Sequence, residues 1–129
     1  QIPLRPSLIA QGKWNPASGA AAVSELLSRG ETFSALVASN DDMAIGAMKQ
    51  LHECGIATPD VVSVIGFDDV AIAPYIVPSL SSVRIPVTEM IKETISRLIF
   101  LLDGGEFKYQ QTFSGELILR DSVIDGPHR

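Results

Sequence analysis

The sequence predicts an α/β fold with a mostly parallel sheet and helices on both faces. Three observations lead to this prediction. β-branched segments alternate along the chain with helical patterns, which is the order typical of parallel sheets. The two clearest strand segments lack apolar–polar alternation, as expected of strands covered on both faces. The 129 residues suffice for one domain with a core but not for two domains.

The first third of the chain predicts a short strand, a helix and a longer strand. Residues 7–11 fit a short strand. Asn15 and Pro16 indicate a helix start, because asparagine caps a helix well and proline is tolerated at its first position. This helix should end at Gly30, since glycine readily adopts the left-handed conformation of a helix stop. Phe33–Ser39 is predicted as the longer strand.

The remaining elements follow the same alternation. A helix begins at Asn40 or Asp41 and ends at Gly55, and a long amphipathic helix begins at Pro86. The other predicted elements are a strand at Val61–Phe67, a short helical turn within residues 71–78, a strand at Ser81–Ile85, and strand segments at 110–113 and 116–120.

The helix after Asn40 is apolar on almost every side in its first half. A helix that covers a sheet needs only one apolar stripe, so the opposite side should be covered as well. One explanation is a second part of the same chain. The other is a homodimer, to which a nearby apolar segment would contribute. The residues predicted for this dimer contact are Met43, Ala44, Ala47, Met48, Leu51, Pro74, Tyr75 and Ile76.

Polar side chains follow two predicted strands at the points where they end. Asn40 follows the first with Asp41 and Asp42, and Asp68 and Asp69 end the second. In open parallel sheets, ligands bind in the crevice at the carboxyl ends of the strands.

Three interpretations of these strand ends stay open. Helix capping alone would recruit asparagine and aspartate. A Mg²⁺ site would use the carboxylates. A sugar is the third interpretation, because an amide and a carboxylate form hydrogen bonds with hydroxyl groups. Trp14 would then be available to cover one face of the sugar ring. Ordinary core packing is the alternative role for Trp14.

Composition and missing motifs exclude several classes of protein. A net charge of -5 with scattered basic residues argues against a nucleic-acid footprint in this segment. No GxGxxG, GxxxxGK[ST] or GxSxG motif and no zinc-type Cys/His cluster occurs, so we expect no enzyme, no metal and no cofactor. The single Cys54 fits a reducing, cytoplasmic compartment. No apolar run reaches the roughly 20 residues of a membrane span.

Three linked motifs resemble one bacterial family. They are A-S-N-D-D-M-A-I-G from Ala38, G-I-A-T-P-D-V-V-S-V-I-G-F-D-D from Gly55, and P-S-L-S-S-V from Pro78. In this order they resemble the effector-binding core of LacI/GalR-type transcriptional regulators, and within that family the β-glucoside-type repressors.

The resemblance implies one lobe of a two-lobed, periplasmic-binding-protein-like fold in a homodimeric, sugar-responsive regulator. Asn40 and Asp68 would bond to hydroxyl groups of a sugar or glycoside, and Trp14 would stack on it. Ile85 stands where the family often has a polar effector contact. A sugar-binding transport protein of the same fold is the alternative.

The resemblance also implies a domain organisation. Residues 1–129 would form a partial effector-binding domain, consisting of the carboxy-terminal lobe and the return segment after Ile85. The amino-terminal lobe and the headpiece through which the family binds DNA would be absent. The helix after Pro86 would cross toward that lobe, so its apolar stripe would be left exposed or buried against a neighbour.

Overall fold

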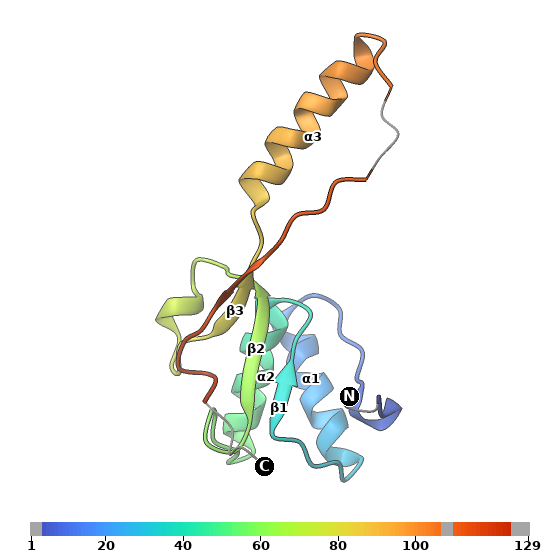
Figure 1. Ribbon diagram of the computed structural model, residues 1–129. Helices are drawn as coiled ribbons and strands as arrows, with labels where there is room; N and C mark the ends of the chain where they lie inside the picture. Colours follow the sequence, from blue (N-terminus) through green and yellow to red (C-terminus); the bar gives the residue numbers. More distant parts are fainter. Residues whose placement is uncertain (1–3, 107–109, 125–129) are drawn as a thin grey trace.

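The computed structural model describes residues 4–106 and 110–124 and contains a four-stranded mixed sheet (Figure 1). Strands β1 (Ala35–Val37), β2 (Ser63–Asp68) and β3 (Ser81–Arg84) are parallel, and β4 (Glu116–Ile118) runs antiparallel to β3. The spatial order β1-β2-β3-β4 follows the sequence. The predicted mostly parallel sheet is therefore confirmed.

Helix α1 (Pro16–Ser28) begins where the sequence predicts. The Asn15 side chain accepts a hydrogen bond from the backbone N–H of Ser18, and the Ser18 hydroxyl accepts one from the backbone N–H of Asn15. This reciprocal capping box satisfies backbone groups that a helix start leaves unpaired. Gly30, with a φ of 72°, follows the end of the helix as predicted.

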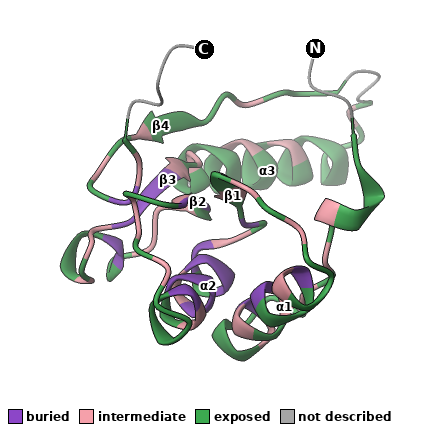
Figure 2. Cartoon of the chain, turned by 90° about the horizontal axis from the view of Figure 1, so that it is seen from below, coloured by how far each residue is buried: buried purple, intermediate pink, exposed green. Residues whose placement is uncertain are grey.

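Helix α2 (Asp41–Glu53) packs in close contact with α1. A Cβ added to Gly46 would lie 1.8 Å from the carbonyl oxygen of Pro16, and one added to Gly19 would lie 2.1 Å from that of Met43. Both glycines therefore allow the two backbones to approach. Figure 2 shows the buried residues of both helices gathered in this layer beneath the sheet.

The close contact between α1 and α2 corrects the predicted dimer contact. The five α2 residues assigned to it are at most 8% exposed because the core of the chain itself covers them: Met43, Ala44, Ala47, Met48 and Leu51. The other predicted explanation, a helix packed between the sheet and another part of its own chain, accounts for their apolar character. Of the remaining three, Pro74 and Tyr75 are exposed and Ile76 is partly buried.

The described helices do not cover both faces of the sheet. Burial alternates along β2, with Val64 and Gly66 buried and Phe67 39% exposed. Val37 of β1 is 80% exposed. α1 and α2 lie over the same face, so no described helix covers the other face of the sheet. Uniformly apolar strands indicated two covered faces, but only one is covered within this part of the chain.

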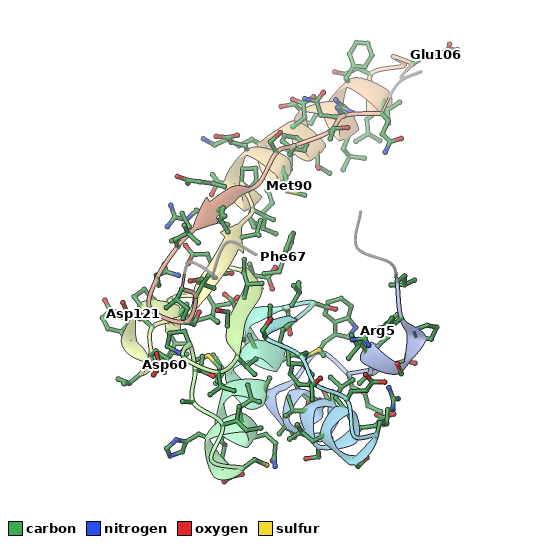
Figure 3. All side chains as sticks on the ribbon, turned by 60° about the horizontal axis from the view of Figure 1, so that its bottom comes forward. Arg5, Asp60, Phe67, Met90, Glu106 and Asp121 are labelled. Atoms are coloured by element: carbon green, nitrogen blue, oxygen red, sulfur yellow. The ribbon has the colours of Figure 1, made fainter. Side chains whose placement is uncertain are left out.

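Helix α3 (Val87–Leu102) projects away from the sheet and has no buried residue (Figures 1 and 2). In Figure 3, Phe67 lies at the end of the sheet nearest α3, Met90 near the base of the helix and Glu106 beyond its far end. The predicted apolar stripe is present and exposed along the helix: Val87, Met90, Ile91, Ile95, Leu98, Ile99 and Leu102. None of the described helices is both long enough and apolar enough to span a membrane.

Two predicted strands are absent. Within residues 7–11, the chain forms the end of a 3₁₀ turn, η1 (Pro6–Leu8), and then runs extended without a partner strand. A hollow of about 280 Å³ separates this segment from β1, so the ladder that defines a strand cannot form. Residues 110–113 also lie outside the sheet. Residues 125–129 lie outside the described residues.

The short helical turn predicted within residues 71–78 is present as η2 (Ala73–Tyr75). Its position after β2 places Tyr75 and Val77 on the surface, where they are 79% and 97% exposed. A hollow of about 380 Å³ lies between this segment and α2, lined by apolar residues that include Ile45, Met48 and Val77. The lining of this hollow is therefore mostly apolar, with Lys49, His52 and Thr58 as its polar members.

Candidate functional site

The carboxyl ends of β1 and β2 meet at one edge of the sheet. The two strands pair in parallel, with Val37 opposite Ile65, and the backbone N–H of Ala38 continues the ladder at 2.9 Å from the oxygen of Ile65. β1 leads through Asn40 into α2, whereas β2 ends at Asp68. The polar residues that follow the two strands therefore share an edge, as the sequence predicts.

Asn40 is linked directly to the turn that contains Trp14. Its Oδ1 accepts a hydrogen bond from the backbone N–H of Met43 at 3.0 Å, which caps α2. Its Nδ2 donates to the backbone oxygen of Trp14 at 3.4 Å. Capping is thus one function of Asn40, and its side chain remains partly exposed. Trp14 is 68% exposed, so its alternative role in the core is wrong.

The carboxylate of Asp68 has no hydrogen-bond or ion-pair partner among the described residues. Partial burial raises its pKa above the ordinary value, and the negative charges of Asp41 and Asp42 raise it further. The carboxylate therefore lies beside the start of α2 and has free acceptor capacity. An unpaired carboxylate held among like charges gains from any donor or cation that reaches it.

The neighbouring acid Asp41 is fully engaged and has no exposed surface. Its Oδ1 accepts from the Ser82 hydroxyl at 2.6 Å, and its Oδ2 accepts from the backbone N–H of Val70 at 2.8 Å. A Cβ on Gly66 would lie 2.0 Å from Oδ1, so the buried carboxylate requires glycine at that position of β2. Asp41 joins α2 to β3 and to the turn after β2.

Asp69 is also engaged, between two arginines. Its Oδ2 accepts from Nε of Arg84 at 2.7 Å, and its Oδ1 forms an ion pair with Nη2 of Arg120 at 2.6 Å. Burial alone would raise the pKa of Asp69, but hydrogen bonds and charges from Arg120 and Arg84 outweigh burial and lower it. Asp69 is therefore ionised at neutral pH. Arg84 also bonds to Glu116 of β4, at 3.3 Å.

The edge thus contains four carboxylates with different environments. Asp41 and Asp69 are occupied by partners within the chain, Asp42 is exposed, and Asp68 is partly buried and unpaired. Among the described residues, no group of three or more His, Cys, Asp or Glu side chains has an arrangement that could hold a metal ion. The arrangement instead offers an amide, a free acceptor and an exposed aromatic ring to a polyhydroxylated molecule.

Sequence reasoning identified the acids of this edge but not the residues that hold them. Ser82, Arg84 and Arg120 become relevant only through contacts with acids 15 to 51 positions away in the chain. The Asp-Asp doublets were a signal that the two strand ends carry more than a helix cap. The sequence had no feature to indicate which member of each doublet is buried.

Comparisons with known proteins agree with the fold and with the quoted motifs. Residues 3–123 match the periplasmic binding protein-like domain family. Over 123 residues the chain is 72% identical to the HTH-type transcriptional regulator AscG of Escherichia coli strain K12, covering 95% of this chain and 37% of AscG. The chain therefore spans little more than a third of that relative.

Solved structures give the same result. The crystal structure of the Escherichia coli transcriptional repressor AscG matches with a TM-score of 0.85 and 70% identity, over 96% of this chain and 45% of that one. A CelR–cellobiose complex matches with a TM-score of 0.89 and 29% identity, over 94% of this chain and 37% of that one. The lac repressor dimer bound to operator and the anti-inducer ONPF matches with a TM-score of 0.83 and 27% identity, over 88% of this chain and 40% of that one.

Proposed function

Because the chain belongs to the LacI/GalR family of transcriptional regulators, we propose that it is the effector-sensing part of a sugar-responsive, DNA-binding regulator. The observation that carries the proposal is the unpaired Asp68 carboxylate at the same edge as the Asn40 amide and the exposed Trp14 ring. The effector belongs to the sugars and glycosides. The role in transcription assigns the protein to the cytoplasm.

The chemistry of the three side chains supports a sugar ligand. A carboxylate accepts hydrogen bonds from two adjacent hydroxyl groups, and an amide both donates and accepts. Hydrogen bonds to an ionised acceptor are roughly twice as strong as neutral ones. Trp14 offers an apolar ring for one face of the sugar. CelR, a relative in fold, was solved in complex with cellobiose, which makes a β-glucoside a reasonable first probe.

The exposed stripe of α3 and the open edge of β1 support a two-lobed parent domain. We propose that residues 1–129 are the carboxy-terminal lobe with its return segment, and that an amino-terminal lobe covers α3. The hollow of about 280 Å³ beside β1 would receive a further strand. The family's DNA-binding headpiece would make the contact with DNA, since this chain has a net charge of -5 and lacks the basic footprint for it.

We propose a homodimer whose contact in this chain is the surface around η2, rather than the buried residues of α2. Tyr75 and Val77 are exposed beside the apolar hollow of about 380 Å³, and the lac repressor structure with operator is a dimer. Tyr75→Ser combined with Val77→Ser should shift the sedimentation of a dimer toward that of a monomer. Val61→Ser, the same type of substitution at an exposed position before β2, is the matched control.

Binding of an effector would then act through the dimer. Closure of two lobes around the sugar changes their relative orientation and so the spacing of two headpieces on DNA. Such a shift requires a different affinity of the effector for the two arrangements. No observation in this chain favours the alternative of a transport protein.

The single Trp14 allows a direct test by intrinsic fluorescence. Titration of the chain with cellobiose and with salicin, an aryl β-glucoside, should give a saturable change, which Asp68→Ala should abolish. Asp60→Ala removes an exposed acid ahead of β2 and should leave the titration unchanged. An Asp68→Ala variant with unchanged affinity would contradict the site assignment, and no response to either glycoside would contradict the β-glucoside class.

A further inference from the structure

The end of β2 contains two consecutive non-glycine residues with positive φ. Asp68 has a φ of 111° and Asp69 a φ of 55°. Aspartate tolerates positive φ better than most residues, yet each such conformation is strained and persists only where the surroundings enforce it. The turn that presents Asp68 is therefore held in place by other groups.

Two backbone amides after Asp68 are held by one buried pair of side chains. The N–H of Asp69 donates to the Ser82 hydroxyl at 3.0 Å, and the N–H of Val70 donates to Oδ2 of Asp41 at 2.8 Å. Ser82 itself donates to Asp41 at 2.6 Å, and neither side chain is exposed. The buried pair fixes the course of the chain after the turn.

The side chain of Asp69 fixes the turn from the other direction. It is 5% exposed and lies between Arg84, the last residue of β3, and Arg120, which follows β4. Arg120 also donates to the backbone oxygen of Leu80 at 2.6 Å. β3 leads out to α3, and β4 brings the chain back from it (Figure 1). One carboxylate therefore joins the turn to the end of β3 and to the residue two positions past β4. We call these two stretches of chain, β3 and β4 with the residues that follow it, the connecting segments.

We propose that Asp69, held between Arg84 and Arg120, is a positioning residue that fixes the Asp68 turn and couples ligand binding at Asp68 to the two connecting segments. The inference rests on the proposed function, since it assigns the regulation of that same site. A change in the course of either connecting segment moves an arginine, and through Asp69 it moves the neighbouring ligand-binding carboxylate. Binding at Asp68 favours the course in which both arginines stay paired.

The first test needs no ligand. Asp68 has a raised pKa because the turn holds it partly buried and close to Asp41 and Asp42. Carbon-13 NMR of the chain should follow this titration in the parent and in Arg120→Gln and Arg84→Gln. If the arginines hold the turn, its relaxation lowers the pKa of Asp68 toward the ordinary value. If they act only as charges, loss of a cation raises that pKa or leaves it unchanged, which would overturn the inference.

The second test measures affinity for cellobiose by Trp14 fluorescence. Arg120→Gln should weaken binding about tenfold, the lower end of the loss seen when a hydrogen-bond partner that orients a metal ligand is removed. Arg120→Lys, which keeps the charge, should recover part of the affinity. Arg5→Gln, at an exposed arginine that forms an ion pair of 3.8 Å with Glu31, is the matched control. Arg84 is half exposed, so its glutamine variant gives a readout if Arg120→Gln fails to fold.

The outcomes separate this inference from the proposed function. If the parent does not bind cellobiose but the pKa of Asp68 is lowered in the arginine variants, the positioning role is supported. The same result contradicts a ligand of the cellobiose type. Loss of binding in Asp68→Asn, with unchanged Asp68 titration and unchanged affinity in both arginine variants, keeps the function and overturns the positioning.

Discussion

Replacement of Asp41 by alanine should be among the most destabilising single changes at the candidate site. The carboxylate has no exposed surface and accepts two hydrogen bonds, from the Ser82 hydroxyl and the Val70 N–H. Hydrogen bonds to a charged group contribute about 1.5–3 kcal/mol each, so loss of both should lower the free energy of unfolding by about 4 kcal/mol. That is a large part of the roughly 5–15 kcal/mol that stabilises a typical domain.

Asp41→Asn should be milder. Asparagine keeps the shape of the side chain, and its oxygen still accepts from the Val70 N–H while its amide donates to the Ser82 oxygen. We expect a loss of about 1–2 kcal/mol, the desolvation cost of an imperfectly paired polar group. This variant remains folded enough for measurement if the alanine variant does not.

Asp42→Ala is the matched control, since Asp42 lies in the same first turn of α2 but is exposed. It loses only the interaction of a carboxylate with the helix dipole, about 0.3–1 kcal/mol. Urea unfolding followed by circular dichroism measures all three variants. Equal midpoints for Asp41→Ala and Asp42→Ala would refute the reasoning, because burial and the two bonds would then contribute nothing.

Three further predictions concern other parts of the chain. Gly46→Ala should lower stability by about 1–3 kcal/mol, as overpacking does, because its Cβ meets the Pro16 oxygen at 1.8 Å; a urea midpoint equal to the parent's would contradict the contact. The raised pKa of Asp68 favours folding below the ordinary carboxyl pKa, and this contribution is lost as pH rises through the raised value. Asp68→Asn should therefore unfold at a higher temperature than the parent near neutral pH, with the gain vanishing in acid, and a lower unfolding temperature at neutral pH would refute the sign. Ile95→Ser with Leu98→Ser should leave the urea midpoint unchanged and reduce self-association in light scattering, since both residues are over half exposed; a clear loss of stability would show that α3 is packed.

The sequence was sufficient to predict local structure but not all of the tertiary pairing. Asn15 and Pro16 predicted the start of α1 because capping depends on neighbouring residues alone. Residues 7–11 were predicted as a short strand, yet a strand also requires a partner, and the space beside β1 is a hollow. The prediction therefore failed where a contact distant in sequence decides the structure.

The covering of α2 shows the same limit. Its apolar circumference correctly indicated a second contact, but hydrophobicity does not distinguish a partner subunit from another helix of the same chain. Gly19 and Gly46 were the overlooked signal, since small residues allow helix backbones to approach. At the site, Asn40 and Asp68 were predicted to share an edge and do so, whereas the buried state of Asp41 depends on Ser82, far along the chain.

Helix α3 has a consequence for how the chain loses its structure. Most of the stability of a helix in a protein comes from the packing of its apolar face, and the 16 residues of α3 have neither a side-chain cap nor a buried residue. Amide protons of α3 should exchange with deuterated solvent far sooner than those of α2, which the core protects. Whatever molecule comes to cover the stripe would slow that exchange, and the helix would then report the arrival of its neighbour.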